Sequence, residues 1–301
     1  MSKVRKVFIT VKTYPTLSKK YDELVCTAGI LDDGSWGRIY PLPFRKLDYE
    51  NRYRKYQWLE APLVKNEGDP RPESYKIANI DQVKLLGEAI GTKQGWAERK
   101  DIIFNNNPVY SDLDNLIKKA NNNELSIAVF KPSAIQDLVI EQTDRQWSQE
   151  NLAILEAKSK QLSLFQTPEE VKREFMVVDK LPYKFSYKFR DCNDRESTLM
   201  IEDWEIGMLY WNCLEQAGGN ESNALKLVKK KYIDEFSKKD IFLFLGTTRQ
   251  FHGWAKNPFV IIGVFYPPVN NQLSLFPFYH SSGVIPDESE KAAGIKRRHS
   301  Q

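Results

Sequence analysis

The sequence predicts an α+β protein with an N-terminal, mostly-β, barrel-like domain followed by a C-terminal α+β domain. Three observations support this fold class. Hydrophobic residues make up 41% of the 301 residues, which is enough for a packed core in two domains of ordinary size. Short segments in which apolar residues alternate with other residues dominate the first half of the chain. Apolar residues at helical spacing lie between strand-like segments in the second half.

The first domain is predicted to cover residues 1–147. Val7, Ile9 and Val11 alternate with other residues, a pattern typical of a strand over residues 4–12. The turn signal Asp32-Asp33-Gly34-Ser35 joins the next two strands. The further expected elements are strands at residues 21–31, 36–44, 57–64, 125–131 and 137–141, and helices around residues 95–104 and 111–120.

A second domain is predicted in the remaining chain. The expected divisions are a helix and linker at residues 148–181, the domain itself at residues 182–268 and an extended tail at residues 269–301. Tyr183, Phe185, Tyr187 and Phe189 alternate with basic residues and a serine, which indicates a strand with one aromatic and one basic face. The further expected elements are helices at residues 201–214 and 222–237, strands at residues 240–246 and 259–266, and a loop at residues 247–258.

The most specific motif is the pentapeptide Gln-Leu-Ser-Leu-Phe, which occurs twice. It spans residues 161–165 in the expected linker and residues 272–276 in the expected tail. The flanking residues differ, so the copies are not one duplicated segment. Each copy alone could be an apolar segment that packs on its own domain, but two identical copies in connecting segments favour a binding motif. The pentapeptide resembles the motif by which bacterial replication and repair proteins bind the sliding clamp.

The resemblance implies that the pentapeptide docks in extended form into an apolar pocket of the clamp. The glutamines would contact the pocket rim, and the leucines and phenylalanines would fill the pocket. Each large apolar side chain contributes roughly 1.5–3 kcal/mol when it is fully buried. Two copies on one chain would raise avidity. The residues implied in clamp binding are Gln161, Leu162, Leu164, Phe165, Gln272, Leu273, Leu275 and Phe276.

Aromatic and basic residues interleave over residues 36–58. Basic side chains bind phosphates and aromatic rings stack on bases, so this pattern suits single-stranded or distorted DNA. The alternative is a barrel strand with aromatic residues inside and solvated charges outside. The candidate nucleic-acid-binding residues in and near this segment are Trp36, Arg38, Tyr40, Arg45, Arg52, Arg54, Lys55 and Arg71.

The loop at residues 247–258 is the second candidate nucleic-acid interface, because two apolar strands would hold it rigidly. Arg249 and Gln250 offer directional hydrogen bonds, and Trp254 offers a stacking face. His252 is the only histidine inside a predicted domain, which makes it a candidate general acid or base. The alternative is a hairpin loop whose aromatic residues cover the edge of a sheet.

Glu202, Asp203 and Glu205 are the candidate catalytic acids. They lie early in an expected helix, where acidic residues stabilise the helix dipole without any catalytic role. They would hold Mg²⁺ if the protein were a nuclease. No other cofactor is evident, because the three cysteines and three histidines lack the paired spacing of a zinc site and the chain has no glycine-rich phosphate loop.

Several short segments resemble an uncharacterised bacterial protein family over residues 1–268. These segments are Lys12–Pro15, Val25–Gly29, Arg38–Pro41 with Phe44 and Arg45, Asp69–Tyr75 and Glu202–Gly207. This resemblance implies no particular activity and no catalytic residue.

Together these patterns predict a DNA-associated protein that the sliding clamp recruits. It would act in DNA repair, replication-linked processing or anti-phage defence, as a nuclease or a base-acting enzyme. The alternative is a non-enzymatic DNA-binding adaptor that links the clamp to other proteins, and a third class is a small-molecule enzyme in which the pentapeptides are accidental.

The composition predicts a cytoplasmic protein with no membrane partner. No apolar run reaches the roughly 18–20 residues of a membrane helix, and the N-terminus lacks the apolar stretch of a signal peptide. Three cysteines far apart in sequence fit a reducing compartment. The net charge of +4 does not by itself imply nucleic acid.

Overall fold

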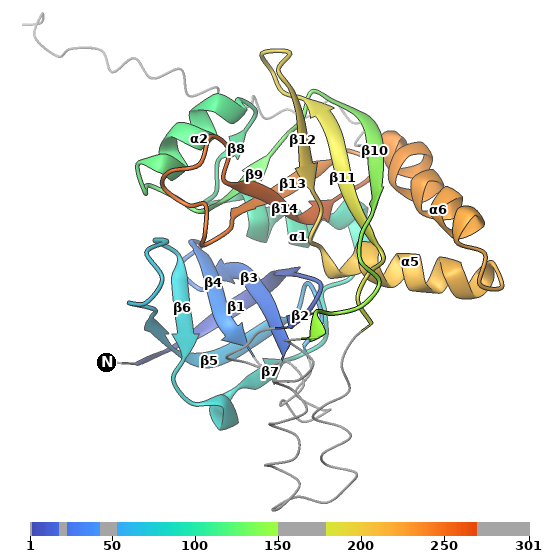
Figure 1. Ribbon diagram of the computed structural model, residues 1–301. Coiled ribbons are helices and arrows are strands. Elements are labelled where there is room, and N and C mark those ends of the chain that lie inside the picture. Colours follow the sequence, from blue (N-terminus) through green and yellow to red (C-terminus); the bar gives the residue numbers. More distant parts are fainter. Residues whose placement is uncertain (1, 18–22, 43–52, 150–178, 270–301) are drawn as a thin grey trace, which may run out of the picture. The chain divides into compact units, whose positions relative to one another are not determined.

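The computed structural model describes residues 2–17, 23–42, 53–149 and 179–269 (Figure 1). Several predictions lie outside these residues. They concern Arg45, Arg52, both pentapeptides and most of the expected linker and tail.

Five strands of the N-terminal region close into a barrel. They are β1 (Lys3–Lys12), β3 (Glu23–Leu31), β4 (Trp36–Leu42), β5 (Trp58–Lys65) and β6 (Ser74–Ile77). Hydrogen bonds connect them in the order β1-β3-β4-β6-β5, and β5 pairs again with β1. The β4–β6 pair is parallel and the other pairs are antiparallel. Numbered along the chain, the barrel strands follow the order 1-2-3-5-4-1, which is the topology of the five-stranded Greek-key barrel called the OB-fold.

Two short strands extend this sheet, and a helix follows it. β2 (Thr16–Leu17) pairs with β3, and β7 (Lys84–Leu86) pairs with β5. A single 3₁₀ turn, Ile80–Gln82, precedes β7, and α1 (Lys93–Phe104) ends the region. The N-terminal region is therefore mostly β, as the sequence predicts.

The C-terminal region contains two sheets. The strands are β8 (Val109–Tyr110), β9 (Ile127–Phe130), β10 (Ala134–Gln142), β11 (Tyr183–Arg190), β12 (Glu196–Met200), β13 (Phe242–Thr247) and β14 (Phe259–Phe265). One sheet has the order β10-β11-β12 and the other β14-β13-β9-β8. A parallel bridge between Ile201 and Ile261 joins the end of β12 to β14.

The two C-terminal sheets together repeat the strand order of the first barrel. Only residues 131–133 separate β9 from β10, so the two form one bent first strand. This strand pairs with β11 through its second half and with β13 through its first half. β12 and β14 are the third and fifth strands, and their bridge is parallel, as is the corresponding pair β4–β6. The protein thus contains two barrels of the same topology.

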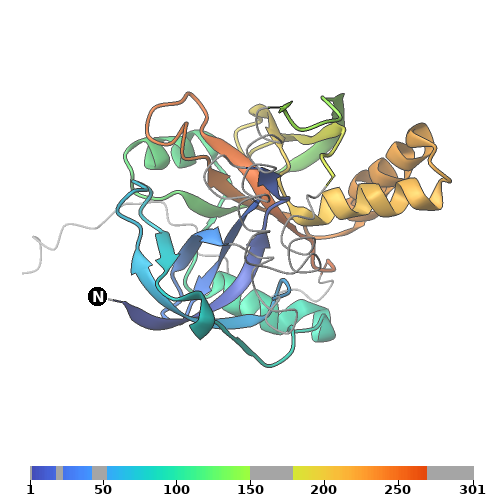
Figure 2. The ribbon, with the colours of Figure 1, turned by 60° about the horizontal axis from the view of Figure 1, so that its bottom comes forward.

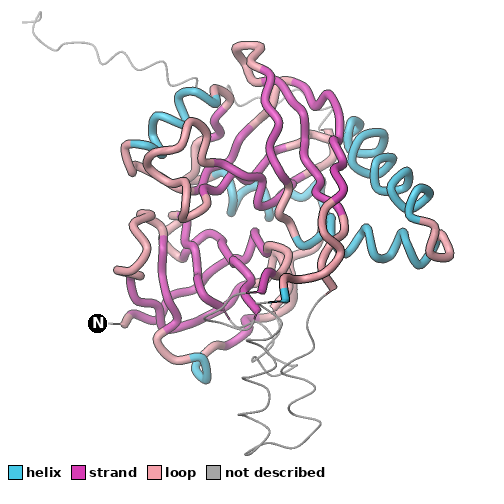
Figure 3. Tube along the Cα trace, in the orientation of Figure 1, coloured by secondary structure: helices cyan, strands magenta, loops and turns pink. Residues whose placement is uncertain are grey.

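Helices lie on the outside of the second barrel (Figure 3). They are α2 (Leu113–Asn121), α5 (Trp204–Gln216) and α6 (Glu221–Lys229). Asp112, Asp203 and Asn220 cap their N-termini by accepting backbone N–H groups, as short polar side chains do. Gly218 and Gly219 have positive φ and end α5, so the chain can reverse into α6. α6 continues as a π-helical stretch, Lys230–Glu235, and a 3₁₀ turn, Phe236–Lys238, which divide the helix expected at residues 222–237.

The barrels share a hydrophobic cluster. Val7 and Ile9 point into the first barrel, while Phe8 points out of it and joins Phe244 and Phe265 of the second barrel. β1 is therefore buried on both faces over its last six residues. Figure 2 shows strands of the two barrels side by side, with α5 and α6 projecting away from them. A shared core of this kind makes the two barrels one structural unit.

The strand pairing places the division between the barrels earlier than the sequence suggests. Residues 127–142, expected in the first domain, pair with β11 and β13 of the second barrel. β2, β6, β7, β8 and β12 were not expected at all. Four of these have four residues or fewer, and the alternation of apolar residues is too short there to indicate a strand.

Candidate nucleic-acid interface

The loop between β13 and β14 connects the fourth and fifth strands of the second barrel. In OB-folds this connection is one of the loops that bind ligands. The sequence placed the loop correctly, because β13 ends at Thr247 and β14 begins at Phe259. It lies beside α2, drawn in orange-red next to the green helix in Figure 1.

Hydrogen bonds of the buried His252 anchor the loop to the rest of the second barrel. His252 is 8% exposed, and its Nδ1 lies 3.0 Å from the hydroxyl of Thr247. Its Nε2 lies 2.8 Å from the side-chain oxygen of Asn123, at the end of α2. An amide oxygen only accepts, so Nε2 carries the proton and Nδ1 accepts from the threonine hydroxyl. Both ring nitrogens are therefore occupied within the fold.

The charge state of His252 agrees with an anchoring role. Burial lowers the pKa of this imidazole, and the positive charge of Arg71 lowers it further. The ring is thus kept neutral near pH 7. Asn121 adds a hydrogen bond of 3.5 Å from its side chain to the carbonyl of Ala255, on the far side of the loop.

The top of the loop presents aromatic and basic side chains to solvent. Trp254 is 68% exposed and Phe251 is 40% exposed, and their ring centroids lie 5.7 Å apart. The indole N–H of Trp254 donates to the carbonyl of Gln250 at 2.8 Å, which holds the ring in place. Arg249 and Lys256 are exposed beside them. Exposed rings next to exposed cations are the combination that binds single-stranded nucleic acid.

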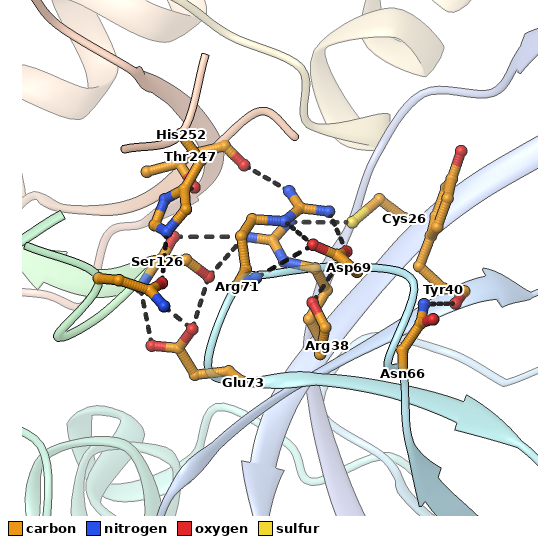
Figure 4. Close-up of polar contacts among 12 residues, drawn as sticks. Cys26, Arg38, Tyr40, Asn66, Asp69, Arg71, Glu73, Ser126, Thr247 and His252 are labelled. Atoms are coloured by element: carbon orange, nitrogen blue, oxygen red, sulfur yellow. Dashed lines mark hydrogen bonds and ion pairs between the residues drawn. The ribbon is translucent and has the colours of Figure 1, made fainter. Parts of the chain in front are cut away.

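The base of the loop is also tied to the first barrel (Figure 4). Arg71 donates to the carbonyl of Thr247 at 2.6 Å. The same guanidinium makes a two-point pair with Asp69, at 2.9 and 2.6 Å. Burial raises the pKa of Asp69, but the bonds and charge of Arg71 outweigh this and lower it to about 2. The pair therefore remains charged at neutral pH.

Arg38 and its neighbours continue this polar contact between the barrels. Arg38 is 2% exposed and donates to Cys26 Sγ at 3.3 Å and to the carbonyl of Ser126 at 3.2 Å (Figure 4). Ser126 in turn donates its N–H and its hydroxyl to Glu73, at 2.8 and 2.5 Å. Arg38 and Arg71 thus hold the barrels together rather than lie on an exposed surface.

Most other residues of the expected interleaved patch also have internal positions. Trp36 packs edge-on against Phe244 in the shared cluster, with centroids 5.6 Å apart. Lys55 lies in an ion pair described below, and Tyr40 is half-buried. Arg54 is exposed. Described residues from this segment therefore form no exposed patch comparable to the loop.

The three candidate acids lie at the N-terminus of α5. Asp203 is fully buried, caps the helix and accepts the N–H of Val264 at 3.2 Å. Lys55 of the first barrel lies 3.0 Å from Asp203 and 3.2 Å from Glu205. Burial opposes the charge of Lys55, yet the two carboxylates raise its pKa well above the usual value. Burial raises the pKa of Glu202.

These acids therefore join α5 to the first barrel. In the described ranges, no group of three or more histidine, cysteine, aspartate or glutamate side chains is placed to hold a metal ion. Among the helices described, none is long and apolar enough to cross a bilayer.

Sequence reasoning missed the residues that position the loop. Asn121 and Asn123 lie about 130 residues before the loop, and nothing in their surroundings marks them as its partners. Thr247 was included only as the first residue of the loop. The exposed residues of the loop were found, because an aromatic and basic segment between two apolar strands is a local signal.

Two families match the chain. The first, described as domain of unknown function DUF8758, matches residues 3–105, and the second, domain of unknown function DUF8757, matches residues 110–280. The second match covers more than half of the chain, so the protein belongs to the DUF8757 family. No curated protein matches the sequence. The boundary between the matches coincides with the boundary between the barrels, after α1 and before β8.

Proposed function

We propose that this protein is a DNA-associated protein that a bacterial sliding clamp recruits, and that it binds single-stranded or distorted DNA through the loop between β13 and β14. The cellular setting we propose is DNA repair, replication-linked processing or anti-phage defence, in the cytoplasm. The loop supports DNA binding, and the two pentapeptides support recruitment by the clamp.

The observation that carries DNA binding is the rigid presentation of Trp254 and Phe251. Their rings are exposed, yet the loop beneath them is fixed by His252 and by the carbonyl of Thr247. A fixed ring loses little conformational freedom when a base stacks on it. One such stack contributes roughly 1–3 kcal/mol. Arg249 and Lys256 lie beside the rings and suit the phosphates between stacked bases.

The contacts of the candidate catalytic residues favour a binding protein over an enzyme. Both nitrogens of His252 are hydrogen-bonded within the fold, and Asp203 caps a helix while it neutralises Lys55. These contacts give the candidate catalytic residues structural roles. We therefore favour the adaptor, a protein that binds DNA and links the clamp to other proteins, over a nuclease or a base-acting enzyme.

DNA binding is tested with the double variant Phe251→Ala/Trp254→Ala. We expect its affinity for a labelled single strand to fall roughly 5- to 150-fold in fluorescence anisotropy, the equivalent of one base stack. Val4→Ala is the matched control, because Val4 is 58% exposed and lies on the other barrel. Unchanged affinity in the double variant, with an unchanged melting temperature, would exclude the loop as the binding site.

Clamp binding is tested separately. Replacing Leu275 and Phe276 by alanine, alone and together with Leu164 and Phe165, removes the apolar side chains that would fill the clamp pocket. We expect the single-copy variant to bind purified clamp more weakly and the two-copy variant to lose binding. Equal binding by wild type and the two-copy variant would show that the pentapeptides are not clamp motifs.

A further inference from the structure

A groove of about 370 Å³ runs between the two barrels, within the size range of small-ligand pockets. The first barrel contributes Lys65 and Tyr75, and the second contributes Tyr110 and Glu124. Its apolar floor includes Trp36 and Ile127, both buried in the cluster that the barrels share. The groove therefore has a rigid floor, aromatic walls from both barrels and a rim of polar side chains.

Two polar side chains of the groove make no hydrogen bond within the described structure. The carboxamide of Asn106 is exposed at the rim, where it packs over Gly34. Tyr110 is half-buried in the wall, and its hydroxyl is a hydrogen-bond donor and acceptor. Neighbouring Asn107, in contrast, uses its side-chain N–H groups on the carbonyls of Gly34 and Ile103.

The remaining polar groups are already engaged. Lys65 donates to the carbonyl of Pro72, and its ammonium lies 4.2 Å from the centroid of the Tyr75 ring. Glu73 accepts from Ser126, and Glu124 pairs with Lys119 at 2.9 Å. Two carboxylates against one lysine on the groove wall disfavour a phosphate there. The free hydroxyl and carboxamide above an apolar floor instead suit a planar, uncharged ring with hydrogen-bonding edges.

One short segment connects the groove to the loop that carries Trp254. Asn123 anchors His252 of the loop, while the next residues, Glu124 and Leu125, line the groove. The loop lies beside α2 (Figure 1), and Tyr75 of β6 lines the groove. The anchor of the loop and part of the groove lining are therefore consecutive residues of one segment.

We infer that the groove between the barrels holds one unstacked base of the single strand that the loop binds, with Asn106 and Tyr110 hydrogen-bonded to the edge of the base. This inference rests on the proposed function of the loop. The base lies on Trp36 and Ile127, and its phosphates remain outside, towards Arg249 and Lys256 of the loop. The carboxamide both donates and accepts, so bases of either hydrogen-bonding pattern fit.

The test uses the full chain and single strands that carry one 2-aminopurine, whose fluorescence differs between a base stacked on its neighbours in the strand and a base held against the aromatic rings of the groove. We expect wild type to change the fluorescence at one position of the strand when the protein is in excess. Asn106→Ala/Tyr110→Phe should abolish this change and weaken binding about fivefold, the lower end of the range for one base. Asn106→Trp, which fills the groove from an exposed position, should have the same effect.

Controls separate the groove from the loop. Lys76→Ala changes an exposed lysine on β6 beside Tyr75 but outside the groove, and it should behave as wild type. If the groove variants bind and unstack the base as wild type does, while Phe251→Ala/Trp254→Ala still weakens binding, the groove inference is overturned and the function of the loop stands. If the loop variant also binds as wild type, the proposed function itself fails.

Discussion

The two barrels have the same strand order but use the same face differently. In OB-folds the outer face of the second and third strands binds the ligand. In the first barrel this face carries Ala28, Ile30 and Trp36, and all three are buried against the second barrel. In the second barrel the equivalent strands, β11 and β12, carry Lys184, Lys188 and Arg190 on their outer face. One barrel thus uses the face for internal packing and the other leaves it in solvent.

The exposed face of the second barrel is nevertheless largely neutralised. Lys188 pairs with Glu196 at 2.8 Å, and Arg190 lies opposite Glu196 in the register of β11 and β12. Lys184 lies opposite Glu141 of β10. Its positive charges are therefore balanced, whereas Arg249 and Lys256 on the loop make no ion pair in the described structure. Equal topology does not give equal binding surfaces, because function depends on the side chains that the strands carry.

The largest effect is expected from the contact that joins the barrels. Arg71→Ala would leave Asp69 buried without its partner and the carbonyl of Thr247 without its donor. Breaking a buried pair in this way costs about 3–5 kcal/mol. We expect that loss in the free energy of unfolding, measured by urea denaturation of the full chain. In a double-mutant cycle, Asp69→Ala/Arg71→Ala should lose less than the sum of the single variants. Strict additivity would contradict a direct pair.

A loss of stability at acid pH should be the next largest effect. The pKa of Asp69 is about 2 in the folded protein and about 4 in an unfolded chain. A lowered pKa contributes stability above the unfolded value, and that stability is lost as the pH falls from about 4 to 2. It amounts to roughly 2.5 kcal/mol, because one pKa unit corresponds to about 1.4 kcal/mol. Unfolding measured at pH 5 and pH 2.5 should show a smaller pH dependence in Asp69→Asn than in wild type. The same dependence in both proteins would place the acid effect elsewhere.

A smaller pH dependence of stability is expected from His252 in the loop. Burial lowers the pKa of His252 in the folded state, so the unfolded chain binds a proton first as the pH falls below about 6.5. Stability is therefore lost towards acid pH. His252→Gln keeps a polar side chain without the titration, and it should remove part of the difference between pH 7.5 and pH 5.5.

The smallest effect should separate the loop from the strand face of the second barrel. Arg249→Gln should reduce the slope of log affinity against log salt by about 0.7, because one phosphate contact on a single strand is lost. Lys188→Gln should leave the slope almost unchanged, since Lys188 is paired with Glu196. If the two variants change the slope equally, the strand face of the second barrel takes part in binding and the contrast between the loop and that face disappears.

Local patterns determined what was predictable from the sequence. The alternation of aromatic and basic residues in β11 gave the strand and its inward face, because Phe185, Tyr187 and Phe189 are buried. The loop was found because two apolar strands enclose it. The pairing of β9 with β13 joins segments more than a hundred residues apart, and no local signal specifies such a pair.

Buried charges were the main obstacle to predicting the candidate sites from the sequence. Arg38 reaches Ser126 over 88 positions and Lys55 reaches Asp203 over 148 positions. In the sequence these side chains look like those of a basic surface, because the residue type alone does not show whether an arginine or lysine is solvated or buried. Only the fold reveals which cations meet a partner. The candidate interface was therefore half predictable: the exposed loop was found, and the polar contact beneath it was not.

The cluster that the barrels share has a consequence for how the two modules are made. Phe242, Phe244 and Phe265 of the second barrel are covered by the first, so the second barrel synthesised alone would present these rings to water. An apolar patch of that kind promotes aggregation. The two modules must therefore be translated as one polypeptide or meet soon after synthesis. A recombination event that exchanged either module would yield a soluble protein only if the incoming one brought a matching apolar face.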